Sequence, residues 1–149
     1  MTSELYRQLI IDHSKNPRNF GKLEHPTNSC IGHNTLCGDK IEIQMRIEDG
    51  IIKEIAFSGT GCAISQASSS LLTQSLKGKP EAEIQKYSDL FRLMMLGKAS
   101  DEQLELLGKL SVFRSVTAYP SRIKCAVLPW HTVLGAFSNE EVAKSDDVY

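Results

Sequence analysis

Apolar residues alternate with polar ones along residues 41–47, where isoleucines and a methionine occupy every second position. A period of two predicts a strand with one buried side and one solvent-facing side. Asp49-Gly50 follows, a pair typical of tight hairpin turns, and residues 51–57 resume an apolar pattern. The pattern therefore predicts an antiparallel hairpin over residues 41–57.

Helical periodicity, with apolar residues three or four positions apart, covers most of the remaining chain. It predicts helices over residues 3–15, between Gly61 and Gly78, over residues 81–96, from Ser100 to Leu110, and from about Pro120 to Phe137. Ser100 and Gln103 match a capping box. Pro129 lies inside the last segment and is expected either to kink that helix or to mark its first turn.

The segments between these elements are polar. Residues 17–39 are rich in proline, asparagine, glycine and histidine, which predicts mostly loop with one short strand near Cys30. Residues 138–149 are expected to form a frayed tail. Strands that precede most of the helices predict an α+β fold, a small antiparallel sheet of about three strands packed against four to six helices. At 149 residues without repeats, the chain 1–149 is expected to be a single domain.

Composition narrows the classes of function. Lys and Arg number 17 and Asp and Glu 18, a formal net charge of −1, which argues against nucleic-acid binding through a broadly basic face. No stretch approaches the roughly 20 apolar residues of a membrane span. The first four residues, Met-Thr-Ser-Glu, lack the features of a signal peptide. We therefore expect a cytoplasmic protein with no nucleic-acid or membrane partner.

Three of the four cysteines lie at the ends of predicted elements. Cys37 precedes the first strand of the hairpin, Cys62 lies at a strand-to-helix turn, and Cys125 lies near the start of the last helix. The free N–H groups of a helix N-terminus favour the thiolate over the thiol. A thiolate is both a nucleophile and a ligand for soft metals.

Asp39, two residues after Cys37, adds a carboxylate to these three thiolates. Three sulfurs and one oxygen form a tetrahedral donor set for Zn²⁺. Four anionic ligands leave an excess of negative charge, which Arg122 and Lys124 beside Cys125 can offset. The spacing leaves two alternatives, a shared metal site and separate structural thiols, because the chain has no paired C-x-x-C signature.

Two other residues of the same region have simpler interpretations. Cys30 is expected to be an inert buried or loop residue. His33 is a possible substitute ligand, but a solvated loop histidine is the simpler interpretation. A Cys–His hydrolase built on Cys125 and His131 is disfavoured, because a separation of six positions does not align two side chains on one helix.

Five motifs occur in order along the chain. They are Asn16-Pro17-Arg18-Asn19, Cys37-Gly38-Asp39, Gly61-Cys62-Ala63-Ile64-Ser65 with Ser68-Ser69-Ser70, Lys77-Gly78-Lys79, and Arg122-Ile123-Lys124-Cys125. Together they resemble the IscU/NifU-N family of iron–sulfur cluster assembly proteins over residues 4–137. Two features match its SufU-type branch. Lys124 stands where the scaffold branch has histidine, and residues 98–118 resemble an insertion typical of SufU.

The resemblance implies a SufE/NifU-like α+β fold that gathers Cys37, Asp39, Cys62 and Cys125 at one exposed end, where they bind zinc. It implies that Cys37 is the catalytic residue, the acceptor of sulfur. The protein would then be a zinc-dependent sulfurtransferase that takes persulfide sulfur from a SufS-type, PLP-dependent cysteine desulfurase and passes it toward SufBCD-type assembly machinery. The cations next to Cys125 would contact the ligands or this partner.

Two alternative functions use the same residues. The first is an IscU-type scaffold on which a [2Fe–2S] cluster is assembled, with iron or the cluster bound transiently. Such clusters take four protein ligands, and Lys124 is a poor substitute for histidine. The second is a purely structural zinc site. The chain departs from the family at Thr35, which follows Asn34 where proline is usual, so the loop before Cys37 is expected to be less rigid.

Overall fold

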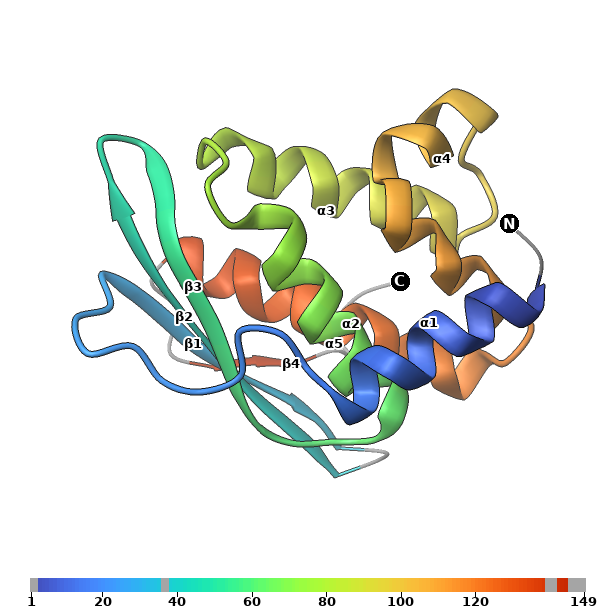
Figure 1. Ribbon diagram of the computed structural model, residues 1–149, viewed down its shortest axis with the longest axis horizontal. Coiled ribbons are helices and arrows are strands. Elements are labelled where there is room, and N and C mark those ends of the chain that lie inside the picture. Colours follow the sequence, from blue (N-terminus) through green and yellow to red (C-terminus); the bar gives the residue numbers. More distant parts are fainter. Residues whose placement is uncertain (1–2, 36–37, 139–141, 145–149) are drawn as a thin grey trace.

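The computed structural model describes residues 3–35, 38–138 and 142–144 of the chain (Figure 1). A twisted sheet lies at one side of the molecule, and the helices cover one of its faces. The predicted α+β class is therefore confirmed, with a three-stranded antiparallel unit and five α-helices.

The sheet has the strand order β3-β2-β1-β4. β1 (Asn28–Asn34) and β3 (Ile51–Thr60) each pair antiparallel with β2 (Asp39–Glu48). The predicted hairpin is present and extends beyond its predicted ends. Asp49 and Gly50 both have positive φ, 53° and 73°, as expected for a two-residue turn that matches the twist of the strands. The predicted short strand near Cys30 is β1.

The prediction of a frayed tail over residues 138–149 was wrong for three residues. β4 (Val142–Lys144) pairs in parallel with β1, with Ile31 opposite Val142. The remaining tail residues 139–141 and 145–149 lie outside the described residues. The edge of β1 offers backbone N–H and C=O groups, and pairing with them needs no apolar pattern. Hydrophobic periodicity therefore gave no signal for this strand.

The predicted helices are all present. They are α1 (Ser3–Lys15), α2 (Ala63–Leu76), α3 (Ala82–Met95), α4 (Asp101–Leu107) and α5 (Pro120–Phe137). The capping box is confirmed, because the hydroxyl of Ser100 accepts from the Gln103 N–H and the Gln103 side chain accepts from the Ser100 N–H. α4 ends three residues earlier than predicted, and the chain continues as the 3₁₀ helix η1 (Gly108–Val116). Pro120 occupies the first turn of α5, so Pro129 lies inside the helix.

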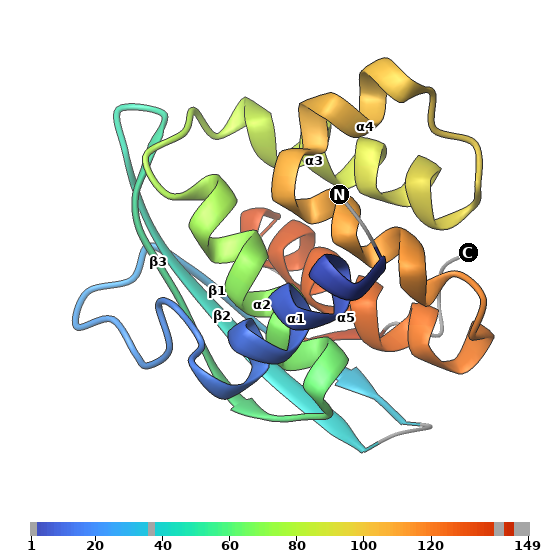
Figure 2. The ribbon, with the colours of Figure 1, turned by 45° about the vertical axis from the view of Figure 1, so that its right-hand side comes forward.

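The insertion-like segment 98–118 is part of the hydrophobic core. α3, α4 and η1 form a layer farther from the sheet than α2 and α5 (Figure 2). Phe91 of α3 stacks on Trp130 of α5, with ring centroids 5.1 Å apart, and meets the edge of Phe113 of η1 at 5.8 Å. Because all three rings are buried, this segment is held by the same packing that holds α5.

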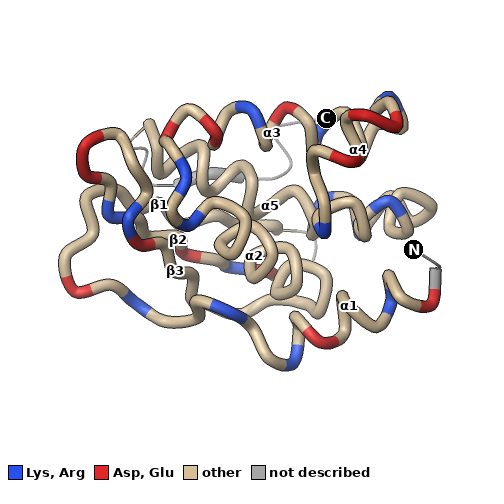
Figure 3. The backbone as a smooth tube through the Cα atoms, turned by 45° about the horizontal axis from the view of Figure 1, so that its top comes forward, with Lys and Arg blue, Asp and Glu red and all other residues tan. Residues whose placement is uncertain are grey.

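Charged residues are distributed over the described part of the chain with both signs interspersed (Figure 3). Within that part, no helix combines the length and apolar character that crossing a bilayer requires.

A buried polar network joins α1 to α2. The Ser70 hydroxyl accepts from the Arg18 backbone N–H at 2.8 Å and forms a hydrogen bond with Nδ1 of His13 at 2.7 Å. Asn19 donates to the hydroxyl of Thr73, also on α2. Burial is the largest cause of the low pKa of His13, about 4 instead of 6.5. Two motifs noted in the sequence, around Arg18 and around Ser70, thus hold the helices together.

We expect stability to depend on pH through His13. The unfolded chain binds a proton near pH 6.5 and the folded protein only near pH 4, so the free energy of unfolding should fall as pH drops between these values. The slope from this group is at most about 1.4 kcal/mol per pH unit. Replacing His13 by Gln should flatten this part of the profile, measured by urea unfolding at several pH values. Replacing the exposed His25 by Gln should leave it unchanged, and an unaltered slope in His13→Gln would contradict the assignment.

Candidate metal centre

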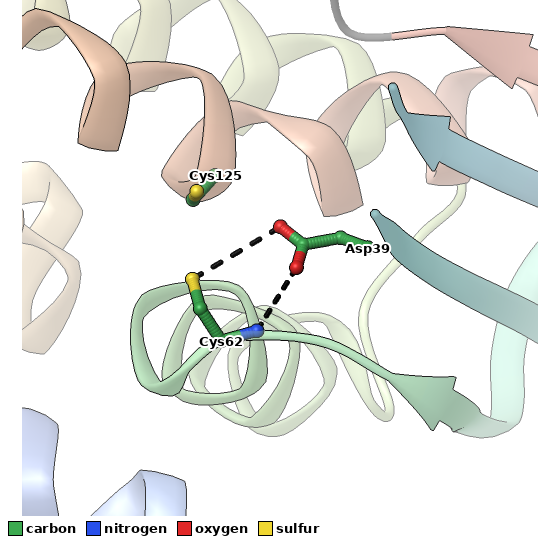
Figure 4. Close-up of side chains that lie close together, drawn as sticks. All are labelled: Asp39, Cys62 and Cys125. Atoms are coloured by element: carbon green, nitrogen blue, oxygen red, sulfur yellow. Dashed lines mark hydrogen bonds between the residues drawn. The ribbon is translucent and has the colours of Figure 1, made fainter. Parts of the chain in front are cut away.

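Asp39 is the first residue of β2, and its side chain is buried with 3% exposure. Its Oδ1 atom accepts a hydrogen bond from the backbone N–H of Cys62 at 3.0 Å (Figure 4). A carboxylate that is buried and accepts a backbone N–H has a defined position, because its rotation would leave that donor unpaired. The carboxylate predicted to be a ligand is therefore held against the start of α2.

Cys62 is the N-cap residue of α2, directly after β3. Two glycines just before Cys62 let the backbone approach neighbouring segments closely. At Gly59, which has φ of +119°, an added Cβ would lie 2.1 Å from the Lys40 carbonyl oxygen, and at Gly61 it would lie 2.3 Å from the Ser65 hydroxyl. The glycines thus let the end of β3 approach β2 and the first turn of α2 closely, which brings Cys62 to Asp39.

Cys125 lies in the second turn of α5 and is fully buried. The side-chain amide of Asn34 donates to its sulfur at 3.7 Å. The hydroxyl of Ser68 on α2 donates to the carbonyl oxygen of Ala126 at 2.6 Å, so α2 and α5 are tied together beside the cysteine. The position of this sulfur is therefore set from both the sheet and α2.

The structure brings three of the four predicted ligands together. The ligand atoms of Asp39, Cys62 and Cys125 all lie within 4.8 Å of one another, and they come from β2, the start of α2 and α5 (Figure 4). The fourth predicted ligand and catalytic residue, Cys37, lies outside the described residues. Three ligand atoms so close together, from segments far apart in the sequence, form a candidate metal site.

This donor set fits a tetrahedral metal ion. With Zn–S near 2.3 Å and Zn–O near 2.0–2.2 Å, ligand atoms in a tetrahedral site lie about 3.5–3.8 Å apart. The ligand atoms of Asp39, Cys62 and Cys125, all within 4.8 Å of one another, are close to this spacing. Zinc and iron both accept thiolate ligands, so the donor atoms by themselves do not decide between the two metals.

The thiol of Cys62 is acidic without a metal. A hydrogen bond with Cys125 is the largest cause of its low pKa, about 5 instead of 9, and hydrogen bonds with Ser65 act in the same direction. Burial and the charge of Asp39 oppose the shift. These hydrogen bonds favour the thiolate of Cys62, the form that binds metals.

The other residues considered in the sequence lie around this group. Cys30 faces the hydrophobic core from β1, which confirms that it is a buried structural residue. His33 is half-buried on β1, and among the described residues it is not in the cluster of possible ligands. Arg122 is exposed in the first turn of α5, where it lines a groove formed with α1 and the start of α2, and Lys124 is half-buried.

Two supporting residues, Asn34 and Ser68, were not predicted as part of the site. The sequence offered a weak signal for Ser68, a hydroxyl among residues on the buried side of a helix. Asn34 ends a short strand inside a segment predicted to be mostly loop, so nothing in the sequence indicated that its side chain is buried. Both were found only through contacts between segments far apart in the sequence.

Known proteins with similar sequences agree with the predicted resemblance. The chain is 40% identical to the zinc-dependent sulfurtransferase SufU of Bacillus subtilis over 137 residues, which cover 92% of each chain. It is 34% identical to the iron–sulfur cluster assembly scaffold protein IscU of Streptococcus pyogenes, over 95% of this chain and 88% of the relative.

A solved structure has the same fold. It is described as an iron–sulfur cluster assembly scaffold protein for the SUF system from Fervidobacterium islandicum, and it superposes with a TM-score of 0.82 at 35% identity. The superposition covers 91% of this chain and 98% of the other. The family model for the NifU-like N terminal domain matches residues 5–126. With sequence, fold and ligand cluster in agreement, the chain belongs to the family of NifU-like N-terminal domains.

Proposed function

We propose that this protein is a SufU-type, zinc-dependent sulfurtransferase in iron–sulfur cluster assembly. The observation that carries the proposal is the convergence of Asp39, Cys62 and Cys125 within 4.8 Å. The SufU relative, which is similar over 92% of both chains, supports zinc as the metal. We further propose that residues 1–149 act as a single domain and that the protein works in the cytoplasm.

Zinc would be held by Asp39, Cys62 and Cys125, with Cys37 as the fourth ligand. Bound zinc keeps cysteine ligands in the thiolate form at neutral pH and has no redox chemistry of its own. Asp39 and Cys125 are buried, and each accepts an N–H hydrogen bond. These described ligands are therefore suited to stay in place while Cys37 reacts.

The transfer step is a thiol–persulfide exchange. The thiolate of Cys37 attacks the outer sulfur of a persulfide on the desulfurase. The sulfur–sulfur bond of the donor breaks, the desulfurase cysteine leaves as a thiolate, and Cys37 becomes the persulfide. The exchange needs no external oxidant or reductant, because the sulfane sulfur keeps its oxidation state.

The sulfur donor in this proposal is a SufS-type cysteine desulfurase, which keeps the PLP cofactor, and the recipient is SufBCD-type assembly machinery. Arg122 supports such docking because it is exposed on the groove beside the start of α2, next to the cysteine cluster. A cation at the edge of an interface mainly affects the rate of association. We assign Arg122 and Lys124 to contacts with the partner or with the charged ligands.

A scaffold for a [2Fe–2S] cluster is the second candidate. The similarity to IscU over 95% of the chain favours it, and the same thiolates can bind iron. The position before Cys125 counts against it, because Lys124 lacks the imidazole nitrogen that ligates iron.

Replacing either cluster cysteine should remove the metal. We expect Cys62→Ser and Cys125→Ser to lower zinc affinity by at least about 100-fold, because each removes one of the few strong donors. Cys30→Ser is the matched control, a buried cysteine outside the cluster, and should bind zinc as the wild type does. Chelator competition measures these affinities. Wild-type affinity in Cys62→Ser or Cys125→Ser would contradict the site.

Replacing the acceptor should stop the reaction. Cys37→Ala is expected to reduce the acceleration of cysteine desulfurase turnover to the rate without added protein, because the proposed accepting thiolate is removed. The measurement is alanine production by a SufS-type desulfurase with wild type, Cys37→Ala and the control Cys30→Ser. Full acceleration by Cys37→Ala would assign the acceptor to another cysteine.

Metal content separates the two candidate functions. A sulfurtransferase should be purified colourless, with zinc near one equivalent, and should accelerate the desulfurase. A scaffold should be purified with iron and visible cluster absorption, or should acquire that absorption when supplied with iron and sulfide under reducing conditions. Stable cluster absorption together with no acceleration would overturn the sulfurtransferase proposal.

A further inference from the structure

Asn34 donates a hydrogen bond to a proposed metal ligand from a buried position. It is the last residue of β1, its side chain is 1% exposed, and its Nδ2 atom lies 3.7 Å from the sulfur of Cys125. The two residues are 91 positions apart in the sequence. Burying an amide is unfavourable without hydrogen bonds, so this contact fixes both the side chain of Asn34 and the sulfur it faces.

The backbone of Asn34 contacts the rest of the site. Its carbonyl oxygen accepts from the Gly38 N–H at 2.8 Å, which closes the turn between β1 and β2. Its partner in the β1–β2 register is Asp39. One residue therefore contacts Cys125 through its side chain, Asp39 through strand pairing, and Gly38 through its carbonyl oxygen.

We propose that Asn34 is a positioning residue that holds the sulfur of Cys125 as a permanent, weakly reactive ligand. This inference rests on the proposed zinc site. A thiolate has no proton to donate, so Asn34 must present its N–H and not its carbonyl oxygen. The N–H···S bond withdraws electron density from the sulfur, which lowers its nucleophilicity while it remains bound to the metal.

The hydrogen bond from Asn34 to Cys125 also reduces the electrostatic repulsion among the ligands of the proposed site. Thiolates and a carboxylate close together repel one another, and burial strengthens the repulsion. Asp39 is stabilised by the N–H of Cys62, and Cys125 by the amide of Asn34. Neutral N–H donors thus supply partial positive charge at both buried ligands without a buried cation.

Two substitutions at Asn34 separate hydrogen bonding from packing. Asn34→Leu keeps the number and branching of the side-chain heavy atoms, at a larger volume, and keeps the backbone bond to Gly38, but it removes the N–H donor. Asn34→Ala removes both donor and volume. The matched control is Asn28→Ala, because Asn28 is also on β1 and donates to α5, at the carbonyl oxygen of Ala136, but outside the ligand cluster. Far-UV circular dichroism of each metal-free protein verifies folding.

The readouts are zinc affinity, by chelator competition, and the sulfur-to-cobalt charge-transfer absorption of the Co²⁺-loaded protein. Loss of an outer hydrogen bond to a ligand lowers metal affinity by about 10- to 100-fold. We expect this loss in both Asn34 variants, together with a shift of the absorption to lower energy, because sulfur without the N–H gives up electron density more easily. Asn28→Ala should change neither readout.

The results distinguish a wrong assignment of Asn34 from a wrong assignment of the site. Wild-type affinity and absorption in Asn34→Leu would show that Asn34 only fills space and would overturn the inference. If Asn34→Leu does not fold, zinc affinity and cobalt absorption are compared between Asn34→Ala and Asn28→Ala. Wild-type values of both readouts in Asn34→Ala would then overturn the inference. Wild-type protein that binds neither Zn²⁺ nor Co²⁺ would instead contradict the proposed zinc site itself.

Discussion

The proposed site depends on holding close together donors from distant parts of the chain that are anionic in their metal-binding form. Asp39, Cys62 and Cys125 have their ligand atoms within 4.8 Å, although they belong to different elements. Repulsion among a carboxylate and thiolates would separate them unless hydrogen bonds oppose it. The N–H of Cys62 and the amide of Asn34 provide that opposition, and the missing side chain of Gly61 leaves the necessary space.

The surrounding framework limits how far these donors can move. The bond from Ser68 to the carbonyl of Ala126 ties α2 to α5, and the contact of His13 with Ser70 ties α1 to α2. Because these bonds are buried, breaking any of them would leave polar groups without water. The serines of α2 thus have structural functions, and the proposed sulfur chemistry remains with the cysteines.

Local features of the fold were predictable where hydrophobic periodicity or a turn pair marked them. The hairpin around Asp49-Gly50 and the helices followed from such patterns. The strand β4 was missed, because it pairs through its backbone with the edge of β1. Pro129 was ambiguous, because its sequence context suits either a first turn or a helix interior, and only the start of α5 at Pro120 resolves it.

The sequence by itself determined the identity of the donors, the elements that carry them and the family, because residue type, periodicity and ordered motifs are local properties. Only the tertiary structure decided that the ligand atoms of Asp39, Cys62 and Cys125 lie within 4.8 Å of one another, and that hydrogen bonds from Asn34 and Ser68 hold the segments around this group. The reason is physical. Those contacts join residues 58 or 91 positions apart, and they form only when packing of the helices on the sheet brings the segments together.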